Sequence, residues 1–523
     1  MTPLAAALVA AGMLGAGEDH AASLIVGTLS EQSASACTLR DAIDSVNAQS
    51  DQGQCVATGS YGSADAVAFA PGLSGTLTFF KHDPLSDPAD PSALVVQRSV
   101  AIQGTGSRQL AITCGNGIFR LLEIDATAPT VSLSGVSLLG CTTKGAGGGV
   151  RADFRLSNVA HAVQFTDVTL AQDTANQGGG LAVFGGTGGD SVTLAACNVM
   201  SNHALTNGGG IYLSDNVTEA RADLSVADSV VGANTAQLGA GAFAVGATAD
   251  ITFTRSTLEG NQASFYGGGI DVENAASASV LDSTLAGNRA ALSGGGARAL
   301  NGASFSATNS TLSGNSAGLS GGGVYALGLG SGAVALANAT LASNIAGGGG
   351  GIAIENTFPV GQMTPANAVS IVDTLVAGNV APSDTLSSEL PGNVLPWNVS
   401  YSVIGVPGNV SPIGPGNITD GAVPPPFGPG GWLGTLRNNG GPTQTHALLT
   451  NVPDPAVDAG DPAFSGLKFD QRGAPFKRVE NGRVDIGAYE VQTAMAAAVP
   501  GPRGPVLSLL AVLLGLLSWR RKR

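Results

Sequence analysis

The chain of 523 residues contains 77 glycines and 43% hydrophobic residues, but only 11% charged and 5% aromatic residues. Glycine at this level without a Gly-X-Y period excludes collagen, and the many Val, Ile, Leu and Ala residues argue against disorder. The formal net charge of −14 repels phosphate groups, so we expect no nucleic-acid partner.

The first segment is typical of an export signal. Residues 4–16 (LAAALVAAGMLGA) form an apolar run that ends in small residues, as the hydrophobic region of a signal peptide does. We therefore expect residues 1–22 to be a signal peptide. The positive charges that usually precede such a run are missing, which a misassigned start codon would explain. The alternative is a buried hydrophobic segment.

Residues 23–112 are predicted to form an N-terminal cap. Within this range, the run ACTLRDAIDSVNA places Leu39, Ile43 and Val46 at helical spacing. A cap is required because the open end of a solenoid exposes unpaired strand edges and apolar core.

The five cysteines predict disulfides and no metal site. In an exported chain, Cys37 and Cys55 are expected to form a disulfide, because they are close enough in sequence to close a short loop. A second bridge between Cys114 and Cys141 is compatible with their separation by one repeat, and Cys197 would then be a free, buried thiol. No CxxC or Cys/His pattern is present, so we expect no metal ion and no cofactor.

An internal repeat occupies residues 113–385 and determines the fold. Glycine triplets begin at 147, 178, 208, 267, 294 and 321, GAG begins at 239, and a five-glycine run covers 347–351. A second motif follows in phase as STLEGN (256–261), STLAGN (283–288), STLSGN (310–315) and ATLASN (339–344).

Each repeat has the alternation of short strands. After the triplet at 267, Ile270 and Val272 are predicted to lie on one face, and Asp271 and Glu273 on the other. Three such strands per repeat predict one coil of a right-handed parallel β-helix, an all-β, pectate-lyase-like solenoid with N- and C-terminal caps. The LxxLxLxxN signature of leucine-rich repeats is absent. A phosphate-binding loop is disfavoured, because neither a following helix nor a Gly-Lys-Ser/Thr ending is present.

An asparagine recurs at the end of the second motif and of its weaker copies. Stacked coils place such residues in a column, in which each amide can bond the next. We interpret this column as a structural ladder; its predicted members are Asn202, Asn234, Asn261, Asn288, Asn315 and Asn344.

Two charged columns are the candidates for catalysis. Asp228, Arg255 and Asp282 occupy one equivalent position on successive coils, and Asp271 and Arg298 occupy another. Paired carboxylates are what a glycosidase needs, so a polysaccharide lyase or glycoside hydrolase is the alternative function. Alternating charge is also what a structural ion-pair ladder has, with each arginine between carboxylates, and we favour that interpretation.

An aromatic column is the candidate for ligand binding. Tyr212, Phe243 and Tyr325 are predicted to share an outward column, where aromatic faces could bind sugar rings or a partner. The alternative, mutual packing of these rings across coils, is favoured.

The C-terminal part divides into three segments. Residues 386–492 contain a proline-rich stretch followed by a C-terminal module, and residues 493–505 form a linker. Residues 506–523 are an apolar run followed by RRKR. As a short hydrophobic helix, the fourteen apolar residues would rise about 21 Å, less than the ~30 Å hydrocarbon core. The arginines would hold its end in the cytoplasm.

Four segments resemble those of known bacterial exported proteins. Residues 36–48 resemble the CSLREA-type motif, and the GGGI and TLxGNxA repeats are similar to those of polymorphic outer-membrane proteins. Residues 433–450 and 470–490 (the latter ending in DIGAYE) resemble the choice-of-anchor Q module. The tail resembles PEP-CTERM and IPTL-CTERM sorting signals, although it has only PGPRGP at 500–505 in place of their motifs, so the sorting enzyme is not specified.

These resemblances imply location and architecture, and they assign no catalytic residue. We expect an exported protein at the cell surface or outer membrane, or secreted, whose tail inserts transiently into the inner membrane. The expected partners are the cell-envelope sorting machinery and glycans or other surface proteins. The expected function is adhesion or cell-envelope interaction without enzymatic activity.

Overall fold

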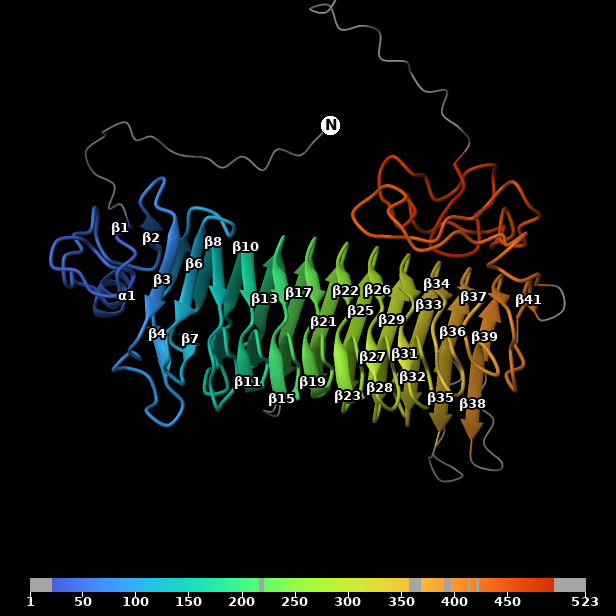
Figure 1. Ribbon diagram of the computed structural model, residues 1–523, viewed down its shortest axis with the longest axis horizontal. Coiled ribbons are helices and arrows are strands. Elements are labelled where there is room, and N and C mark those ends of the chain that lie inside the picture. The colour runs from blue at the N-terminus through green and yellow to red at the C-terminus, as the bar shows by residue number, and fades with distance from the viewer. Residues whose placement is uncertain are drawn as a thin grey trace, which may run out of the picture.

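The computed structural model describes residues 21–215, 221–356, 368–389, 397–412, 414–419 and 423–492. They form an elongated, right-handed parallel β-solenoid of about ten turns, which confirms the predicted fold (Figure 1). The predicted linker 493–505, the tail with its hydrophobic helix, and the first twenty residues of the predicted signal peptide lie outside the described residues.

The described strands belong to three sheets. Sheet I has 24 strands: β1 (Ser23–Val26), β2 (Asp65–Phe69), β3 (Gly75–Phe79), β5 (Val100–Gln103), β6 (Leu110–Cys114), β8 (Thr130–Leu139), β10 (Ala162–Ala171), β13 (Asp190–Ala195), β14 (Asn198–Met200), β17 (Ala222–Ala227), β18 (Val230–Gly232), β21 (Ala249–Thr254), β22 (Thr257–Glu259), β25 (Ser277–Leu281), β26 (Thr284–Ala286), β29 (Ser304–Thr308), β30 (Thr311–Ser313), β33 (Val334–Ala337), β34 (Thr340–Ala342), β36 (Val369–Val372), β37 (Leu375–Val376), β39 (Trp397–Ser400), β40 (Val403–Ile404) and β41 (Ile418–Thr419). Sheet II has six strands: β11 (Thr174–Gln177), β15 (His203–Asn207), β19 (Thr235–Leu238), β23 (Gln262–Tyr266), β27 (Arg289–Ala290) and β31 (Ser316–Ala317). Sheet III has 11 strands: β4 (Ser92–Val96), β7 (Arg120–Asp125), β9 (Val150–Asp153), β12 (Leu181–Phe184), β16 (Ile211–Ser214), β20 (Ala242–Val245), β24 (Ile270–Glu273), β28 (Ala297–Leu300), β32 (Val324–Leu327), β35 (Ile352–Asn356) and β38 (Thr385–Glu389).

One coil in the middle of the solenoid shows how the repeat folds. Strands β21 and β22 lie in sheet I and are separated by a bend at Arg255, whose φ is 48°. The chain then passes through β23 in sheet II and β24 in sheet III. The next coil begins with β25, which pairs in parallel with β21, so that Asp250 lies opposite Ser277. The inward side chains are fully buried and stack between coils; they include Ile251, Phe253, Leu258, Ile270 and Val272.

The glycine triplet makes the tight corner between sheets II and III, and each of its positions has its own constraint. Gly267 has a φ of +61°, which disfavours other residues. A Cβ on Gly269 would lie 2.5 Å from the Gly296 carbonyl oxygen and 3.2 Å from the Asn288 amide nitrogen. Ala240 occupies the middle position of the GAG copy and is buried, so that position accommodates a methyl group.

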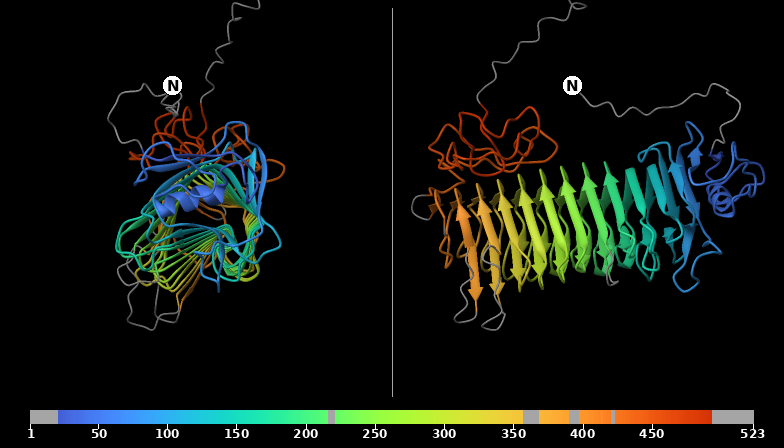
Figure 2. Two further views of the ribbon diagram at one scale, coloured as in Figure 1. Left: turned by 90° about the vertical axis from the view of Figure 1, so that its left-hand side faces the viewer. Right: turned by 180° about the vertical axis from the view of Figure 1, so that it is seen from behind.

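A single described helix, α1 (Leu39–Ala48), lies across the N-terminal end of the coils (Figure 2). The Thr38 hydroxyl accepts a hydrogen bond from the first turn and caps the helix. Leu39, Ile43 and Val46 are buried against the core, at the spacing predicted from the sequence. The helix therefore covers apolar residues that the first coil would otherwise expose.

Residues 423–492 pack along the outer face of sheet I (Figure 1). The Gln471 side chain donates to the Ser283 carbonyl oxygen (3.0 Å) and accepts from the Thr311 hydroxyl (2.6 Å). The His446 imidazole bonds the Ser313 hydroxyl (2.8 Å). This module therefore covers the side of the later coils.

Candidate functional site

The asparagine column lies buried at the bend between sheets I and II. Asn288 donates from its backbone N–H and its side-chain amide to Oδ1 of Asn315, at 3.0 Å each. Its amide also donates to the Leu258 carbonyl oxygen (2.9 Å). The same bonds connect all the asparagines named from the sequence, and they continue to Asn379: Asn202, Asn234, Asn261, Asn288, Asn315 and Asn344. These side chains hold the coils together and do not reach solvent.

Two aspartates end this ladder, and sequence reasoning missed both. Asp384 Oδ1 accepts from the backbone N–H (2.9 Å) and the amide (2.8 Å) of Asn379, so a carboxylate suits this accepting end. At the other end, Asp173 Oδ1 accepts from the Cys141 N–H (2.8 Å). Its Oδ2 has no hydrogen-bond partner within the described residues. Burial raises the pKa of Asp173 well above its usual range.

A second ladder runs through the serines of the STLxGN repeat. The Ser256 N–H donates to Ser283 Oγ (2.9 Å), and the Ser283 N–H donates to Ser310 Oγ (3.1 Å). Each hydroxyl donates back to a carbonyl oxygen, as Ser256 does to Thr254 (2.9 Å). The serine is the first residue of each STLxGN motif in the sequence. Because these serines are buried, their role is to stabilise the stacked coils.

The first charged column lies on the bend in sheet I. Arg255 bonds both carboxylate oxygens of Asp228 at 2.7 Å. Asp282 instead accepts from the Asn309 amide (2.6 Å), so Arg255 pairs with one neighbour rather than with both as expected. The side chains of Arg255 and Asp228 are 43% and 49% exposed, and such surface pairs contribute about 0–1 kcal/mol.

The second charged pair and the aromatic candidates form one column on sheet III, although the sequence suggested two groups. Strand register places Tyr212 beside Phe243, and Phe243 beside Asp271. It then places Asp271 beside Arg298, and Arg298 beside Tyr325. All five side chains are buried.

The aromatic side chains do not form an exposed platform. The rings of Tyr212 and Phe243 stack with centroids 5.7 Å apart, and Phe184 packs on the other side of Tyr212 at 5.5 Å. Leu238 from sheet II packs against this cluster. Tyr325 is also buried, and its hydroxyl donates to Glu355 (2.9 Å). Tyr212 and Phe243 therefore pack against each other, as favoured from the sequence, whereas Tyr325 lies beside Arg298 and does not join them.

The charged part of this column is an enclosed ion-pair network. Arg298 Nε donates to Asp271 Oδ1 (2.8 Å), and the same guanidinium bonds Glu273. It also lies 4.3 Å from the ring centroid of Tyr266. Burial raises the pKa of Asp271 to about 7, against the opposing charge of Arg298. Because Asp271 is fully buried, it cannot contact an external substrate.

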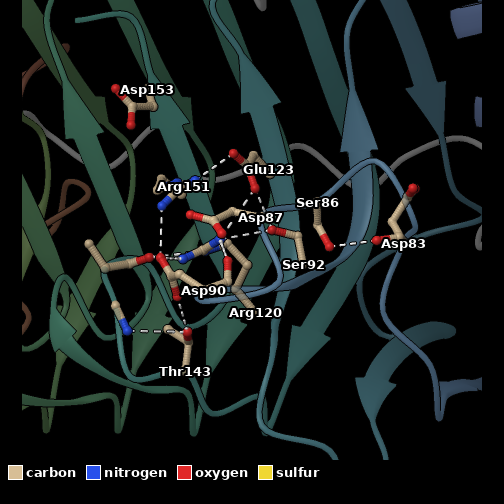
Figure 3. Close-up of polar contacts among 12 residues, drawn as sticks. Asp83, Ser86, Asp87, Asp90, Ser92, Arg120, Glu123, Thr143, Arg151 and Asp153 are labelled. Carbon is tan, nitrogen blue, oxygen red and sulfur yellow. Dashed lines mark hydrogen bonds and ion pairs between the residues drawn. The ribbon is translucent and has the colours of Figure 1, made fainter.

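A larger network near the N-terminus was not predicted, because its members come from a loop and two coils (Figure 3). Arg151 bonds Asp90 (2.7 Å) and Glu123 (2.5 Å). The buried Arg120 bonds the same two carboxylates, and Thr143 donates to Asp90 (2.6 Å). Burial alone would raise the pKa of Asp90. The hydrogen bond from Thr143 and the charges of the two arginines outweigh this effect and hold the pKa of Asp90 below its usual range.

An acidic pocket of about 330 Å³ lies beside this network. Arg155 bonds both oxygens of Asp153 (2.8 and 2.6 Å). Asp125 accepts from the hydroxyl of Thr127 (2.7 Å). Glu123 also lines the pocket, and it is bound within the network described above. Glycoside cleavage needs a proton-donating carboxyl and a second carboxylate available to water or sugar, whereas each carboxylate here bonds the protein itself.

An open groove of about 500 Å³ lies on the outer face of sheet II. Two rows of side chains line it, one residue per coil in each row, on strands that lie side by side. The first row is His203, Thr235, Gln262 and Arg289, and the second is Leu205, Gln237, Ser264 and Ala291. Most of these residues are exposed, in contrast to the buried candidates on sheet III.

Four of the five cysteines form two disulfides. The bridges join Cys37 to Cys55 and Cys114 to Cys141, the two pairs named from the sequence. Cys197 is free and buried, and burial raises the pKa of its thiol to about 11. Such a thiol is not activated for catalysis.

Among the described residues, no group of three or more His, Cys, Asp or Glu side chains could hold a metal ion. No helix within the same residues is both long and apolar enough to cross a membrane. No protein-family model, curated protein or solved structure matches the chain. The family resemblances of the cap, the C-terminal module and the tail therefore stay predictions.

Proposed function

We propose that the chain is an exported, surface-anchored β-helix protein that acts in adhesion or in contact with cell-envelope glycans, without catalysing a reaction. One observation carries the non-enzymatic part. The carboxylates of the candidate columns and of the acidic pocket are bound by side chains of the protein itself, as Asp153 is by Arg155 and Asp271 by Arg298.

Three features support export. Two disulfides suit an oxidising compartment outside the cytoplasm. Residues 1–22 have the composition of a signal peptide, and residues 506–523 have that of a sorting tail read by cell-envelope machinery. In this proposal the tail inserts into the inner membrane transiently, and the body works at the cell surface.

The solenoid suits adhesion because it presents a long, rigid face. Its coils are joined by backbone pairing and by continuous asparagine and serine ladders. Exposed side chains therefore keep fixed spacings of about 4.8 Å from coil to coil, which favours extended ligands.

The test has two parts, one for display of the protein at the cell surface and one for cleavage of polysaccharides. Cells expressing the full chain are treated with an external protease, and the purified protein is incubated with a panel of polysaccharides. We expect peptides from residues 23–492 to be released from intact cells, and no shortening of any polysaccharide. Depolymerisation abolished by Asp153→Asn would contradict the proposal and favour the alternative, a lyase or hydrolase.

A further inference from the structure

The faces of the solenoid differ in what covers them. The C-terminal module packs on sheet I, where Gln471 and His446 bond its strands. On sheet III the outward column from Tyr212 to Tyr325 is buried. Sheet II differs, because His203, Gln262 and Arg289 are exposed, and the half-buried Thr235 lies on the coil between His203 and Gln262.

We propose that the groove on sheet II binds an extended polysaccharide that carries carboxylate groups, such as a polyuronate, with its chain parallel to the solenoid axis. This inference rests on the proposed function and names the class of ligand for it. The spacing of the side chains, the hydrogen-bonding groups and the charge of the groove favour this ligand.

The spacing suits a chain of sugar rings. Residues within a row are about 4.8 Å apart, which is comparable to the length of one monosaccharide in an extended chain. The row from His203 through Thr235 and Gln262 to Arg289 spans four strands, β15 to β27. Four side chains can therefore meet successive sugars of one polymer.

The groups in the groove suit hydroxyls and ring faces. Gln237, Gln262 and Ser264 offer donors and acceptors. Leu205 is 55% exposed and offers an apolar contact for the C–H face of a sugar. A bond between His203 Nδ1 and the Thr235 hydroxyl (2.8 Å) fixes these two side chains in place.

Although the chain has a net charge of −14, the described residues that line the groove include Arg289 and no Asp or Glu, so the local charge favours an acidic sugar. Arg255, at the bend in sheet I, and Arg298, on sheet III, form ion pairs with aspartates. No ion pair is found for Arg289 among the described residues, and its side chain is exposed in the groove. An arginine of this kind presents a planar fork of donors that matches a carboxylate.

An extended peptide fits this face less well. A peptide that adds to a sheet needs unpaired backbone groups. The backbone of β19 and β23 is paired on both sides by neighbouring strands. Recognition on sheet II must therefore use side chains, which favours a ligand with repeated hydroxyl and carboxylate groups.

The experiment measures binding of short oligogalacturonates to the full chain by titration calorimetry. The first variant is Arg289→Gln, and a second is Gln262→Ala. Arg108→Gln is the matched control, because Arg108 is also exposed and lies outside the groove. Oligosaccharides with their carboxylates reduced to alcohols are the matched control for the ligand.

We expect Arg289→Gln to weaken binding of the acidic oligosaccharide about tenfold, as for the loss of one charge-assisted hydrogen bond, and Arg108→Gln to leave it unchanged. Reduction of the carboxylates should weaken binding to the wild type but not to Arg289→Gln. Absence of binding, or equal affinity for Arg289→Gln and Arg108→Gln, would overturn the groove assignment. Equal affinity of the wild type for both ligands would overturn the acidic class. These binding results do not bear on the proposed function itself. That function is tested separately, by display of the protein on cells and by the absence of polysaccharide cleavage.

Discussion

Asp173 differs from the asparagines of the ladder by one atom, an oxygen in the place of the amide nitrogen. A Cβ on Gly180 would lie 2.9 Å from Asn202 Nδ2, and a Cβ on Gly149 would lie 2.7 Å from Asp173 Oδ2. The two atoms therefore occupy equivalent sites. Asn202 Nδ2 donates to the Leu170 carbonyl oxygen (3.0 Å) and to Asn234 Oδ1 (3.1 Å). By this equivalence a protonated Asp173 suits the site as a donor, and the carboxylate does not.

Replacing Asp173 with asparagine should stabilise the solenoid. Burial raises the pKa of Asp173, so the stability that its proton provides is complete below the unfolded pKa of about 4. It is lost as the pH rises through the folded pKa. Asp173→Asn supplies a permanent donor and should raise the free energy of unfolding by about 1–3 kcal/mol where wild-type Asp173 is ionised. Urea unfolding from mildly acidic to alkaline pH measures this, and a difference that does not grow with pH would contradict the assignment.

Asn288→Ala should destabilise the protein by about 1–3 kcal/mol, because the partners of a buried amide are left unsatisfied. Asn198→Ala is the control, since Asn198 lies exposed on the same solenoid, and its effect should stay within about 0.5 kcal/mol. Asn417 would be a poor control, because its side chain bonds Ser402 and Val399. Equal denaturation midpoints for Asn288→Ala and Asn198→Ala would refute the ladder as a source of stability.

At the scale of the element, the C-terminal module depends on buried polar contacts with the coils. Gln471 lies at the centre of this interface and bonds Ser283, Thr284 and Thr311. Within the module, the Arg472 guanidinium lies between the rings of Phe476 and Tyr489, at 3.9 and 3.8 Å. The module therefore has internal order of its own, and it also buries Trp432 and Ile486 against Leu375 of the coils.

Gln471→Ala should loosen the module and leave the solenoid folded. The loss of these buried bonds should cost about 1–3 kcal/mol, and hydrogen exchange should increase across residues 433–490 and at Thr311. Gln492→Ala is the control, because among the described residues the Gln492 side chain bonds only Lys477 and Glu490, both within the module. Equal rates of hydrogen exchange in Gln471→Ala and Gln492→Ala would mean that Gln471 does not hold the module on the coils.

The repeating elements could be predicted from the sequence, because each strand obeys a local pattern. Ile270 and Val272 alternate with Asp271. Asn288 ends the STLAGN motif and precedes the glycine triplet at 294 by the same distance as in neighbouring repeats. The sequence did not predict that sheet II would cover Tyr212 and Phe243. That coverage depends on the sharp corner at the glycine triplet, which brings the end of one strand over the next.

The N-terminal network could not be predicted for a related reason. Asp90 comes from a loop outside the repeat, and it meets Arg120 and Arg151 only after the loop folds against two coils. The groove on sheet II was missed because its residues, such as Gln262 and Arg289, differ in type from coil to coil. A search for columns of like residues cannot detect such a site.

At the scale of the whole molecule, the coils form one rod with α1 across its first end. Figure 2 shows this arrangement from the N-terminal end and from behind. The backbone pairing and the side-chain ladders that join the coils lie within residues 23–492. Deletion of residues 500–523 should therefore leave the solenoid folded but release it to the periplasm or the medium.

Intact-mass measurement tests whether the body works outside the cell after its tail has served as a sorting address. The protein is recovered from the surface of whole cells, and its mass is compared with that of the full chain. We predict a mature form that lacks Trp519 and the RRKR cluster. Surface protein that retains the complete tail would mean that the tail is a permanent anchor, and protein found only in the cytoplasm would contradict export itself.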